Sequence, residues 1–429
     1  MPMGITLHMP KKGLNKQYGK KPIINADTGV FALVAFLLIS GLIGCVILGD
    51  TFRYWDEGQY YAIAKNLVSK GSYSTDGVHP TAYRPPGYPL LLSVLLFCHF
   101  DIVTLRFFNF LFLAGSVIIL HKILSEHFTR EAGLVAGFLT LFYPVLFYTA
   151  GTFYPQTFGA FLFLTYIWLV FRKGGCPFLY SLLTGLVMGL LVLTIPTFVF
   201  VFVLTFFFII ICRKNVKRAL IMTLAVCLVV TPWAVRNCVV FRTFVPFSTN
   251  SGWNLILGNS PNASANSGAS TDISVYTSRA SHLSETERDA YFRSEAIKWI
   301  MSNKVKAISL YFKKVLNYFN FRAGLATKSE SSPYKEIMIF IPYYLLLSLT
   351  VLRFFFVKKY PFSYIEKYFV ACYFANAFFQ AIFYTRIRYR LPFDYLLIGL
   401  VAIFVCQFFP KFEDAQRSRE RRRILTRIK

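Results

Sequence analysis

Long apolar runs separated by short polar segments dominate the sequence from about residue 30 to residue 410. Several runs approach 20 residues, the length that a helix needs to cross the roughly 30 Å hydrocarbon core of a bilayer. A proline is a common first residue of a helix, so we divide the long run near Ile195-Pro196 into two spans. The pattern predicts an all-α integral membrane protein with about ten transmembrane helices. The expected spans are Val30–Leu48, Ile102–Leu124, Ala132–Ala150, Pro155–Phe171, Phe178–Leu193, Thr197–Cys212, Ala219–Val235, Ile337–Val357, Tyr368–Tyr384 and Pro392–Phe409.

Lysine and arginine gather in both terminal segments and in the short connections that follow alternate spans. With ten spans, all of these clusters fall on one side, which the positive-inside rule makes the cytoplasmic side. The predicted organisation is a basic tail (1–29), a multi-span domain (30–410) and a second basic tail (411–429). Two long polar loops, 49–101 and 236–336, then face outward.

Both outer loops contain stretches with the periodicity of amphipathic helices. Apolar residues recur at helical spacing over Asp56–Lys70, and Gly71 is placed to end that helix. In the second loop, Ser284 begins a capping-box pattern, and the amphipathic stretch after it is expected to break near Asn303. We expect these helices to lie along the membrane surface rather than to cross it.

The composition agrees with a membrane protein, since 55% of the residues are hydrophobic. The net charge of +26 would suggest nucleic acid in a soluble protein, but here topology explains the basic residues, so no nucleic-acid partner is expected. Membrane lipid is the expected surrounding. Ionisable residues are rare in the middle of the spans, which argues against a coupled transporter.

Asp56 and Glu57 lie side by side just beyond the first span, in a chain with 20 acidic residues. A carboxylate held in a cleft can act as a general base towards a hydroxyl. Acidic residues also favour the first turn of a helix, where they interact with its dipole. The spacing alone favours this second interpretation.

Arginine precedes proline-started helices at two outward positions: Arg84 comes before Pro85, and Arg386, Arg388 and Arg390 come before Pro392. Helix N-termini and planar guanidinium groups both suit phosphate. The alternative is ordinary flanking charge at the end of a span. Because outward short loops are usually poor in arginine, a recruited anion explains the cluster better, and lipid headgroups remain a possible anion.

Other outward polar residues allow two interpretations. Arg236 and Asn259 lie in stretches rich in polar and turn residues that either bind a sugar or build the loop. His79 is isolated, and the sequence contains no His/Asp/Glu cluster beyond it and the two adjacent carboxylates. No metal is assigned, although a divalent cation is not excluded.

Taken in order, these motifs resemble those of the multi-span glycosyltransferases of the C-type fold that use polyprenyl-phosphate sugars. That group includes the dolichyl-phosphate-mannose protein mannosyltransferases and the aminoarabinose transferases of lipid A. The chain departs from the pattern at Pro155-Gln156 and at Ile195-Pro196, where many relatives have Thr-Glu and Arg-Pro. The segments that carry the resemblance are Asp56-Glu57 with Tyr60-Tyr61 and Gly71, Arg84-Pro85-Pro86-Gly87-Tyr88-Pro89, Pro232-Trp233 with Arg236-Asn237, Phe247 to Asn250, Gly258 to Asn262, and Arg388 to Pro392.

The resemblance implies a transfer reaction at the outer face of a bacterial cell (inner) membrane, with both termini cytoplasmic. Asp56 would take the proton of an acceptor hydroxyl, which attacks a sugar on a polyprenyl phosphate with inversion, and Glu57 would orient the acceptor or the helix. No cofactor is required. The residues expected to bind the lipid phosphate or the sugar are Arg84, Tyr61, His79, Arg236, Asn259, Arg386, Arg388 and Arg390.

The acceptor implied by the resemblance is a hydroxyl of a glycan, lipid or protein. Two other hypotheses stay open. One is a lipid-carrier flippase without glycosyl transfer, and the other is a structural membrane subunit. Substitution of Asp56 separates the enzyme from the flippase.

Overall fold

The computed structural model describes residues 26–172, 174–266, 268, 270–321 and 333–427. These residues form α-helices and one 3-10 turn, with no strand among them, so the predicted all-α class is confirmed. Most of the predicted N-terminal tail lies outside the described residues. The predicted C-terminal tail continues the last helix as far as Arg427.

The helices that make up the bundle, in chain order, are α1 (Ala26–Leu48), α4 (Ile102–His127), α5 (Arg130–Leu141), α6 (Pro144–Ala150), α7 (Gln156–Phe171), α8 (Pro177–Thr194), η1 (Pro196–Phe198), α9 (Val199–Ile211), α10 (Val216–Phe241), α15 (Pro333–Phe355), α16 (Tyr364–Ile382) and α17 (Ile387–Arg427). The helices of the two long loops are α2 (Trp55–Lys70), α3 (Gly87–Phe97), α11 (Ser251–Gly258), α12 (Ser274–Arg279), α13 (Glu285–Ser302) and α14 (Lys304–Tyr318).

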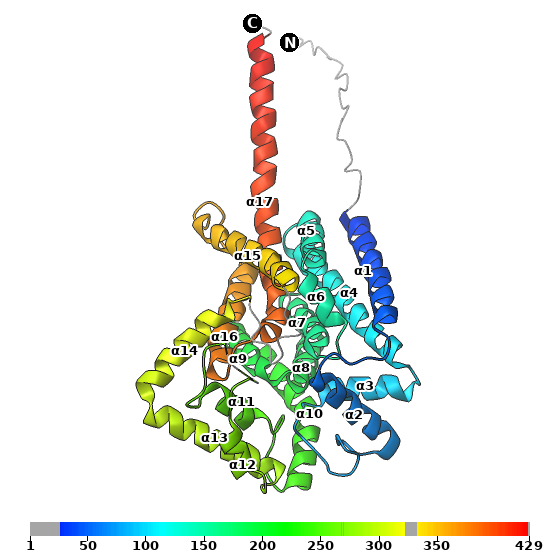
Figure 1. Cartoon of the computed structure of the whole chain (residues 1–429). Coiled ribbons are helices and arrows are strands. Elements are labelled where there is room, and N and C mark those ends of the chain that lie inside the picture. The colour runs from blue at the N-terminus through cyan, green and yellow to red at the C-terminus, as the bar shows by residue number, and fades with distance from the viewer. Residues whose placement is uncertain (1–25, 173, 267, 269, 322–332, 428–429) are drawn as a thin grey trace, which may run out of the picture.

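The two long loops lie at the same end of the molecule. In Figure 1 the start of α1 and the far end of α17 are at the top, whereas α2, α3 and α11 to α14 lie in the lower part. Glu285, at the start of α13, joins the loops directly. Its carboxylate accepts hydrogen bonds from the Thr81 hydroxyl (2.6 Å), the Ala82 amide (2.8 Å) and the Thr249 hydroxyl.

The number of spans differs from the prediction. Among the described residues, six helices are long and apolar enough to cross a membrane, namely α1, α4, α8, α10, α15 from Glu336, and the part of α17 up to Phe409. The pair α5 and α6 would make a seventh span, bent by 69°. The count of ten is therefore not confirmed. Helix α7 and the segment Pro196–Ile211 are apolar but shorter than the roughly 20 residues that a straight crossing needs, and α16 is not among the candidate spans.

Local sequence signals place the ends of the loop helices as expected. Gly71 has a left-handed φ of 66° and ends α2, a conformation that glycine adopts without steric cost. Ser284 and Glu287 form both hydrogen bonds of a capping box at the start of α13. Asn303 separates α13 from α14, and the break at Ile195-Pro196 separates α8 from η1.

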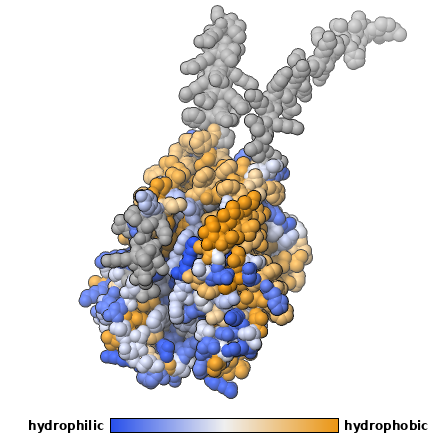
Figure 2. Space-filling model, turned by 45° about the vertical axis from the view of Figure 1, so that its right-hand side comes forward, coloured by the Kyte–Doolittle hydropathy of each residue, from blue (hydrophilic) through white to orange (hydrophobic). Residues whose placement is uncertain are grey.

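Helix α14 presents an apolar face that packs against nothing in the described chain. Val305 and Leu316 are 82% and 72% exposed, while Ala307 and Leu310 on the opposite face are buried. Figure 2 shows the hydrophobic residues gathered in the upper part of the visible face and hydrophilic ones gathered below. The exposed apolar face of α14 fits a helix that lies at the boundary between bilayer and water, as predicted.

Candidate active site

Asp56 lies in the first turn of α2, the helix that follows α1 in the chain. Neighbouring residues of a helix point about 100° apart, so Asp56 and Glu57 face different surroundings. Asp56 points into a polar space between α2 and the start of α17, and its side chain is 22% exposed. Glu57 points into the bundle and is completely buried.

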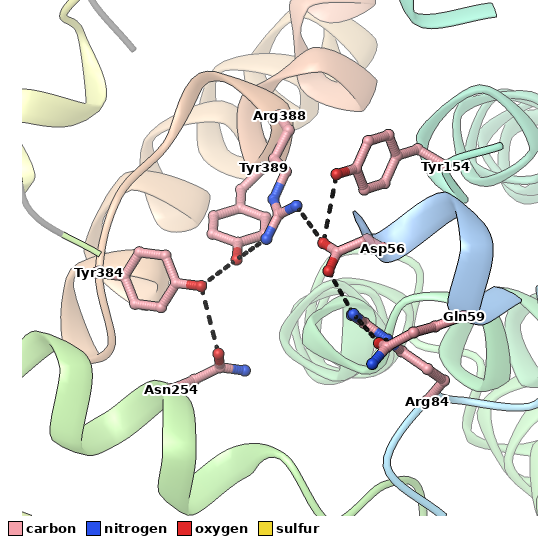
Figure 3. Close-up of polar contacts among 8 residues, drawn as sticks. All are labelled: Asp56, Gln59, Arg84, Tyr154, Asn254, Tyr384, Arg388 and Tyr389. Atoms are coloured by element: carbon pink, nitrogen blue, oxygen red, sulfur yellow. Dashed lines mark hydrogen bonds and ion pairs between the residues drawn. The ribbon is translucent and has the colours of Figure 1, made fainter. Parts of the chain in front are cut away.

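Two arginines hold the two oxygens of Asp56 (Figure 3). Nη2 of Arg84 donates to Oδ1 at 2.5 Å, and Nη1 of Arg388 donates to Oδ2 at 2.9 Å. The hydroxyl of Tyr154 also points at Oδ2, at 3.4 Å. The folding of the chain thus brings together three segments that are up to 332 residues apart in sequence.

Arg84 is held in place by α2. Gln59 lies one helical turn after Asp56, and its side-chain oxygen accepts hydrogen bonds from Nε (2.9 Å) and Nη2 (2.6 Å) of Arg84. The guanidinium also lies over the ring of Tyr60 at 5.0 Å and near that of Tyr83 at 5.2 Å. These aromatic faces favour the positive charge in a largely buried place.

Arg388 is held by a chain of hydroxyl groups that reaches the second outer loop. Its Nη2 donates to the Tyr389 hydroxyl (3.2 Å), which donates to Tyr384 (2.8 Å), which donates to the side-chain oxygen of Asn254 in α11 (3.3 Å). The guanidinium also lies 5.4 Å from the centroid of the Tyr154 ring. This chain connects the catalytic candidate in the first loop to a helix of the second loop.

The electrostatics of the site favour an ionised Asp56. Burial opposes the negative charge, but the charges and hydrogen bonds of Arg84 and Arg388 outweigh it and hold the pKa of the Asp56 carboxyl below its ordinary value. Two guanidinium groups surround one carboxylate, so the cluster carries a surplus positive charge. Such a cluster can accept one further anion.

Glu57 has the role of a structural anchor. Its oxygens accept hydrogen bonds from the backbone amides of Arg53 (3.2 Å) and Phe153 (3.0 Å), which ties the start of α2 to the segment before α7. Burial raises the pKa of the Glu57 carboxyl, although these amides and the nearby charge of Arg106 oppose the shift. Arg106 in turn donates to the carbonyl oxygens of Gly49 and Thr51, the latter at 2.6 Å.

The three arginines at the start of α17 have different surroundings. Arg388 and Arg390 are two residues apart, about 200° around a helix, and so point in nearly opposite directions. Arg390 is fully buried, pairs with Asp394 at 3.2 Å, and donates to the carbonyl oxygens of Tyr318 and Asn320. Arg386 lies beside the ring of Tyr384, at 5.9 Å from its centroid. Among the described residues its Nε and Nη2 have no hydrogen-bond partner.

The remaining predicted residues lie outside the Asp56 cluster. Arg236, near the C-terminal end of α10, donates to the carbonyl oxygen of Thr81 (2.9 Å) and so supports the first loop. Tyr61 packs its ring against Phe52. His79 is 84% exposed and pairs with Asp76. The structure brings none of these three into contact with Asp56 among the residues it describes.

Asn259 is part of a buried junction between the second loop and the segment before α17. Its side-chain oxygen accepts a hydrogen bond from Lys314 (3.1 Å), which also donates to the carbonyl oxygens of Gly258 (3.2 Å) and Phe383 (2.8 Å). Desolvation lowers the pKa of the Lys314 ammonium to about 7. A Cβ at Gly258 would collide with the Phe383 carbonyl oxygen, so this close approach requires glycine.

Several residues of the cluster were not singled out from the sequence. Gln59 could have been found, because it lies three positions after Asp56 and therefore on the same helical face. The roles of Tyr154, Tyr384 and Asn254 have no local signal, since each depends on packing between distant segments. Among the described residues, no group of three or more His, Cys, Asp or Glu side chains could hold a metal ion.

No protein-family model matches the sequence, and no curated protein matches it. Among solved structures, ArnT from Cupriavidus metallidurans bound to undecaprenyl phosphate is similar over 90% of this chain, with a TM-score of 0.53 and 12% identity. This chain spans 61% of the length of that structure. ArnT from the same organism in the apo state gives 12% identity over 88% of this chain and 77% of that one, with a TM-score of 0.43. The first likeness, together with the apolar helices, shows that the chain is a multi-pass membrane protein with the C-type glycosyltransferase fold that the sequence resemblance predicts.

Proposed function

We propose that the protein is a membrane glycosyltransferase that moves a sugar from a polyprenyl-phosphate donor to a hydroxyl acceptor. The observation that carries the proposal is the convergence of Asp56, Arg84 and Arg388, which supplies a base and two phosphate-binding groups at one place. The fold shared with ArnT bound to undecaprenyl phosphate supports the choice of donor class.

In the proposed reaction, Asp56 accepts the proton of the acceptor hydroxyl as its oxygen attacks the anomeric carbon of the donor sugar. The bond from that carbon to the phosphate oxygen breaks, and its electron pair leaves with the polyprenyl phosphate. Attack occurs on the face opposite the leaving group, so the anomeric configuration inverts. A positioned general base typically contributes 10²- to 10⁴-fold to the rate of such a step.

The two arginines would stabilise the leaving group. The phosphate carries one negative charge in the donor and gains a second as the glycosidic bond breaks, and guanidinium groups positioned for that charge lower the barrier. Arg84 and Arg388 are the candidates because they are partly exposed at the Asp56 cluster. Arg390 is not assigned this role, since its buried partner is Asp394. Arg386, whose Nε and Nη2 have no hydrogen-bond partner in the part of the chain that the structure describes, is a candidate for a further contact to the donor.

The site is proposed to face outward, at the bacterial cell membrane. The basic residues of the short connections support a cytoplasmic position for both termini. Helix α2, which carries Asp56, lies in the lower part of Figure 1, away from the start of α1 and the far end of α17. There, α14 and its exposed apolar face would lie against the outer leaflet. In this arrangement a lipid-linked donor reaches the site from the bilayer, and a hydroxyl acceptor reaches it from water.

The test is substitution of Asp56 in cells that lack the wild-type protein. Asp56→Asn keeps the size of the side chain and one accepting oxygen but removes the base, so we expect transfer to fall by about 10²-fold or more. The amount of surface glycoconjugate is measured by mass spectrometry in intact cells. Glu295→Gln is the control, since the ion pair of Glu295 within the described residues is with the exposed Lys298 on the same helix, α13, and it should keep transfer at the wild-type level.

The same experiment separates an enzyme from a flippase. A flippase has no need of a base, so wild-type transfer in the Asp56→Asn strain, with the protein present at a normal level, would rule out the proposed mechanism. A purely structural subunit predicts instead that Arg84→Ala and Arg388→Ala alter assembly without changing turnover per assembled molecule.

A further inference from the structure

The base of the proposed reaction is blocked in the unliganded protein. Both oxygens of Asp56 already accept hydrogen bonds from guanidinium groups, Oδ1 from Arg84 and Oδ2 from Arg388. A carboxylate in this position has lone pairs directed at the arginines and a depressed affinity for protons. It is therefore a poor acceptor for the proton of a hydroxyl until at least one arginine moves away or finds another anion.

The groups around Asp56 supply no other charge that could free it. The other side chains at the cluster are tyrosines and an amide, namely Tyr60 and Gln59 on α2, Tyr154 before α7 and Tyr389 on α17. Glu57 points into the bundle and is bonded to backbone amides. The only charged groups facing Asp56 within the described chain are thus the two arginines, and the missing anion has to come from a ligand.

Both arginines have spare hydrogen-bonding capacity for such an anion. Nη1 of Arg84 has no partner among the described residues, and Nε of Arg388 is buried without one in the same part of the chain. A buried N–H group without a hydrogen-bond partner lowers stability, so the unliganded site has an unmet need for an acceptor at Nε of Arg388. A phosphate oxygen is a suitable acceptor for both groups.

We propose that Arg84 and Arg388 exchange partners during turnover, holding Asp56 in the free protein and passing to the donor phosphate when the donor binds. This inference rests on the proposed function and adds an order to it, because Asp56 becomes an effective base only after the donor is in place. Without donor, an acceptor hydroxyl or water would meet a blocked carboxylate.

Gln59 and Tyr389 are the positioning residues of this exchange. Gln59 holds Nε and Nη2 of Arg84, and Tyr389 accepts from Nη2 of Arg388, so each guanidinium keeps one fixed contact while another changes partner. The two contacts come from the same elements as Asp56 and Arg388 themselves, α2 and α17. The arginines therefore need to turn only locally to leave one anion and reach the other.

Competition for the arginines can be measured without any transfer activity. The probe is the methyl phosphodiester of undecaprenyl phosphate, which like the proposed donor carries one negative charge at every pH used. Its affinity is measured for the full-length protein in nanodiscs, for wild type, Asp56→Asn, Arg84→Gln and the double variant. Thermal unfolding of each variant confirms that it is folded.

We expect Asp56→Asn to bind the probe about tenfold or more tightly than wild type, equivalent to about 1.4 kcal/mol, because no carboxylate competes for the arginines. Removal of the negative charge of Asp56 would also strengthen binding of an anionic probe without any exchange of partners, so the double-mutant cycle is needed to distinguish the two explanations. In wild type, Arg84→Gln removes a contact to the bound phosphate but also a contact to Asp56 in the free protein, so the two losses partly cancel. In the Asp56→Asn background there is no contact to Asp56 to lose. If Arg84 exchanges partners, Arg84→Gln therefore weakens probe binding at least about threefold more in the Asp56→Asn background than in wild type.

Two results overturn the exchange while leaving the proposed function intact: equal or weaker probe binding by Asp56→Asn, or an equal cost of Arg84→Gln in both backgrounds. Absence of binding by wild type and variants alike overturns the exchange and removes the proposed donor class as well. Should Asp56→Asn fail to fold, Gln59→Glu offers the reverse test. Its added carboxylate would hold Arg84, so the exchange requires weaker probe binding than in wild type, and unchanged binding contradicts it.

Discussion

At the scale of single residues, the adjacent carboxylates of Asp56 and Glu57 have different surroundings because their side chains point in different directions. Asp56 is partly exposed and bonded to two arginine side chains, whereas Glu57 is buried and bonded to two backbone amides. The sequence offered two interpretations for this pair, a base or an acidic helix start. Substitutions of the two residues are therefore expected to have different consequences.

Glu57→Gln should destabilise the protein rather than act on the chemistry. An amide NH₂ would replace one oxygen that now accepts a backbone N–H, leaving a buried donor facing a donor at a cost of about 1–3 kcal/mol. The expected result is a lower midpoint of thermal unfolding in detergent. Transfer per folded molecule should fall far less than in Asp56→Asn. A Glu57→Gln protein as stable as wild type would contradict the anchoring role.

The pH dependence of transfer should report the arginines around Asp56. Because they hold the pKa of its carboxyl below the ordinary value of about 3.9, Asp56 stays ionised in the free enzyme at mildly acidic pH, and the acidic limb of kcat/KM for the donor lies below that value. Arg84→Gln removes one positive charge, which raises the pKa and moves the limb to higher pH. A limb at the same pH in both proteins would contradict this explanation.

At the scale of elements, the site depends on contacts between helices of both long loops and the segment before α17. Glu285 joins α13 to the first loop, and Lys314 on α14 joins α11 to the segment between α16 and α17. Arg390 continues the connection by donating to two carbonyl oxygens at the end of α14. The second loop thus fixes the segment that carries Arg388, which explains why residues without direct contact to Asp56 can affect it.

Lys314 gives this junction a characteristic pH dependence of stability. Desolvation lowers the pKa of its ammonium group to about 7 in the folded protein, whereas an unfolded lysine titrates near 10.4. Between these values the unfolded chain binds more protons, so the contribution of Lys314 to the free energy of unfolding rises with pH. The penalty of the buried charge is fully present below about pH 7.

The variant Lys314→Met tests this contribution, because methionine fills a similar apolar volume without a titrating group. The difference in free energy of unfolding between wild type and variant should shift in favour of wild type from pH 7 to pH 10. The measurement is denaturant unfolding in detergent at several pH values. A difference that stays constant across this range would show that Lys314 is not desolvated as the structure indicates.

At the scale of the whole molecule, both long loops lie at one end of the bundle and the turn between α7 and α8 is expected at the other. Helix α8 returns from that turn to Thr194, where its end contacts Gly87 at the start of α3. The orientation of the protein in the membrane can therefore be tested with one position in the first long loop and one in the connection between α7 and α8. Val78 in the first loop and Cys176 before α8 are both exposed.

In a background without other cysteines, a membrane-impermeant maleimide should label Val78→Cys in intact cells. Cys176, retained alone in the same background, should be labelled only after the membrane is permeabilised. The expectation follows from the basic residues Arg172 and Lys173 beside Cys176, which favour the cytoplasmic side. The reverse pattern would place the Asp56 cluster on the cytoplasmic side and contradict the proposed location.

Much of the fold was predictable because its signals are local. Gly71, the capping box at Ser284 and the break at Ile195-Pro196 act on the few residues around them, and the structure has helix boundaries at each. The count of spans was not confirmed. Short apolar helices such as α7 have the composition of a span but not its length, and hydropathy runs do not report where a helix bends, as between α5 and α6.

The candidate site was predictable only in part, and the arginines of α17 show why. The sequence by itself determined that helices form and that their apolar faces need lipid or one another, and it predicted that Asp56 and several arginines lie in outward segments. It could not distinguish Arg388 from Arg390, which share one motif and differ by about 200° in direction. Arg390 pairs with Asp394, four positions further along the same helix. Only the tertiary structure decided that Arg388 reaches Asp56, because that contact joins residues 332 positions apart.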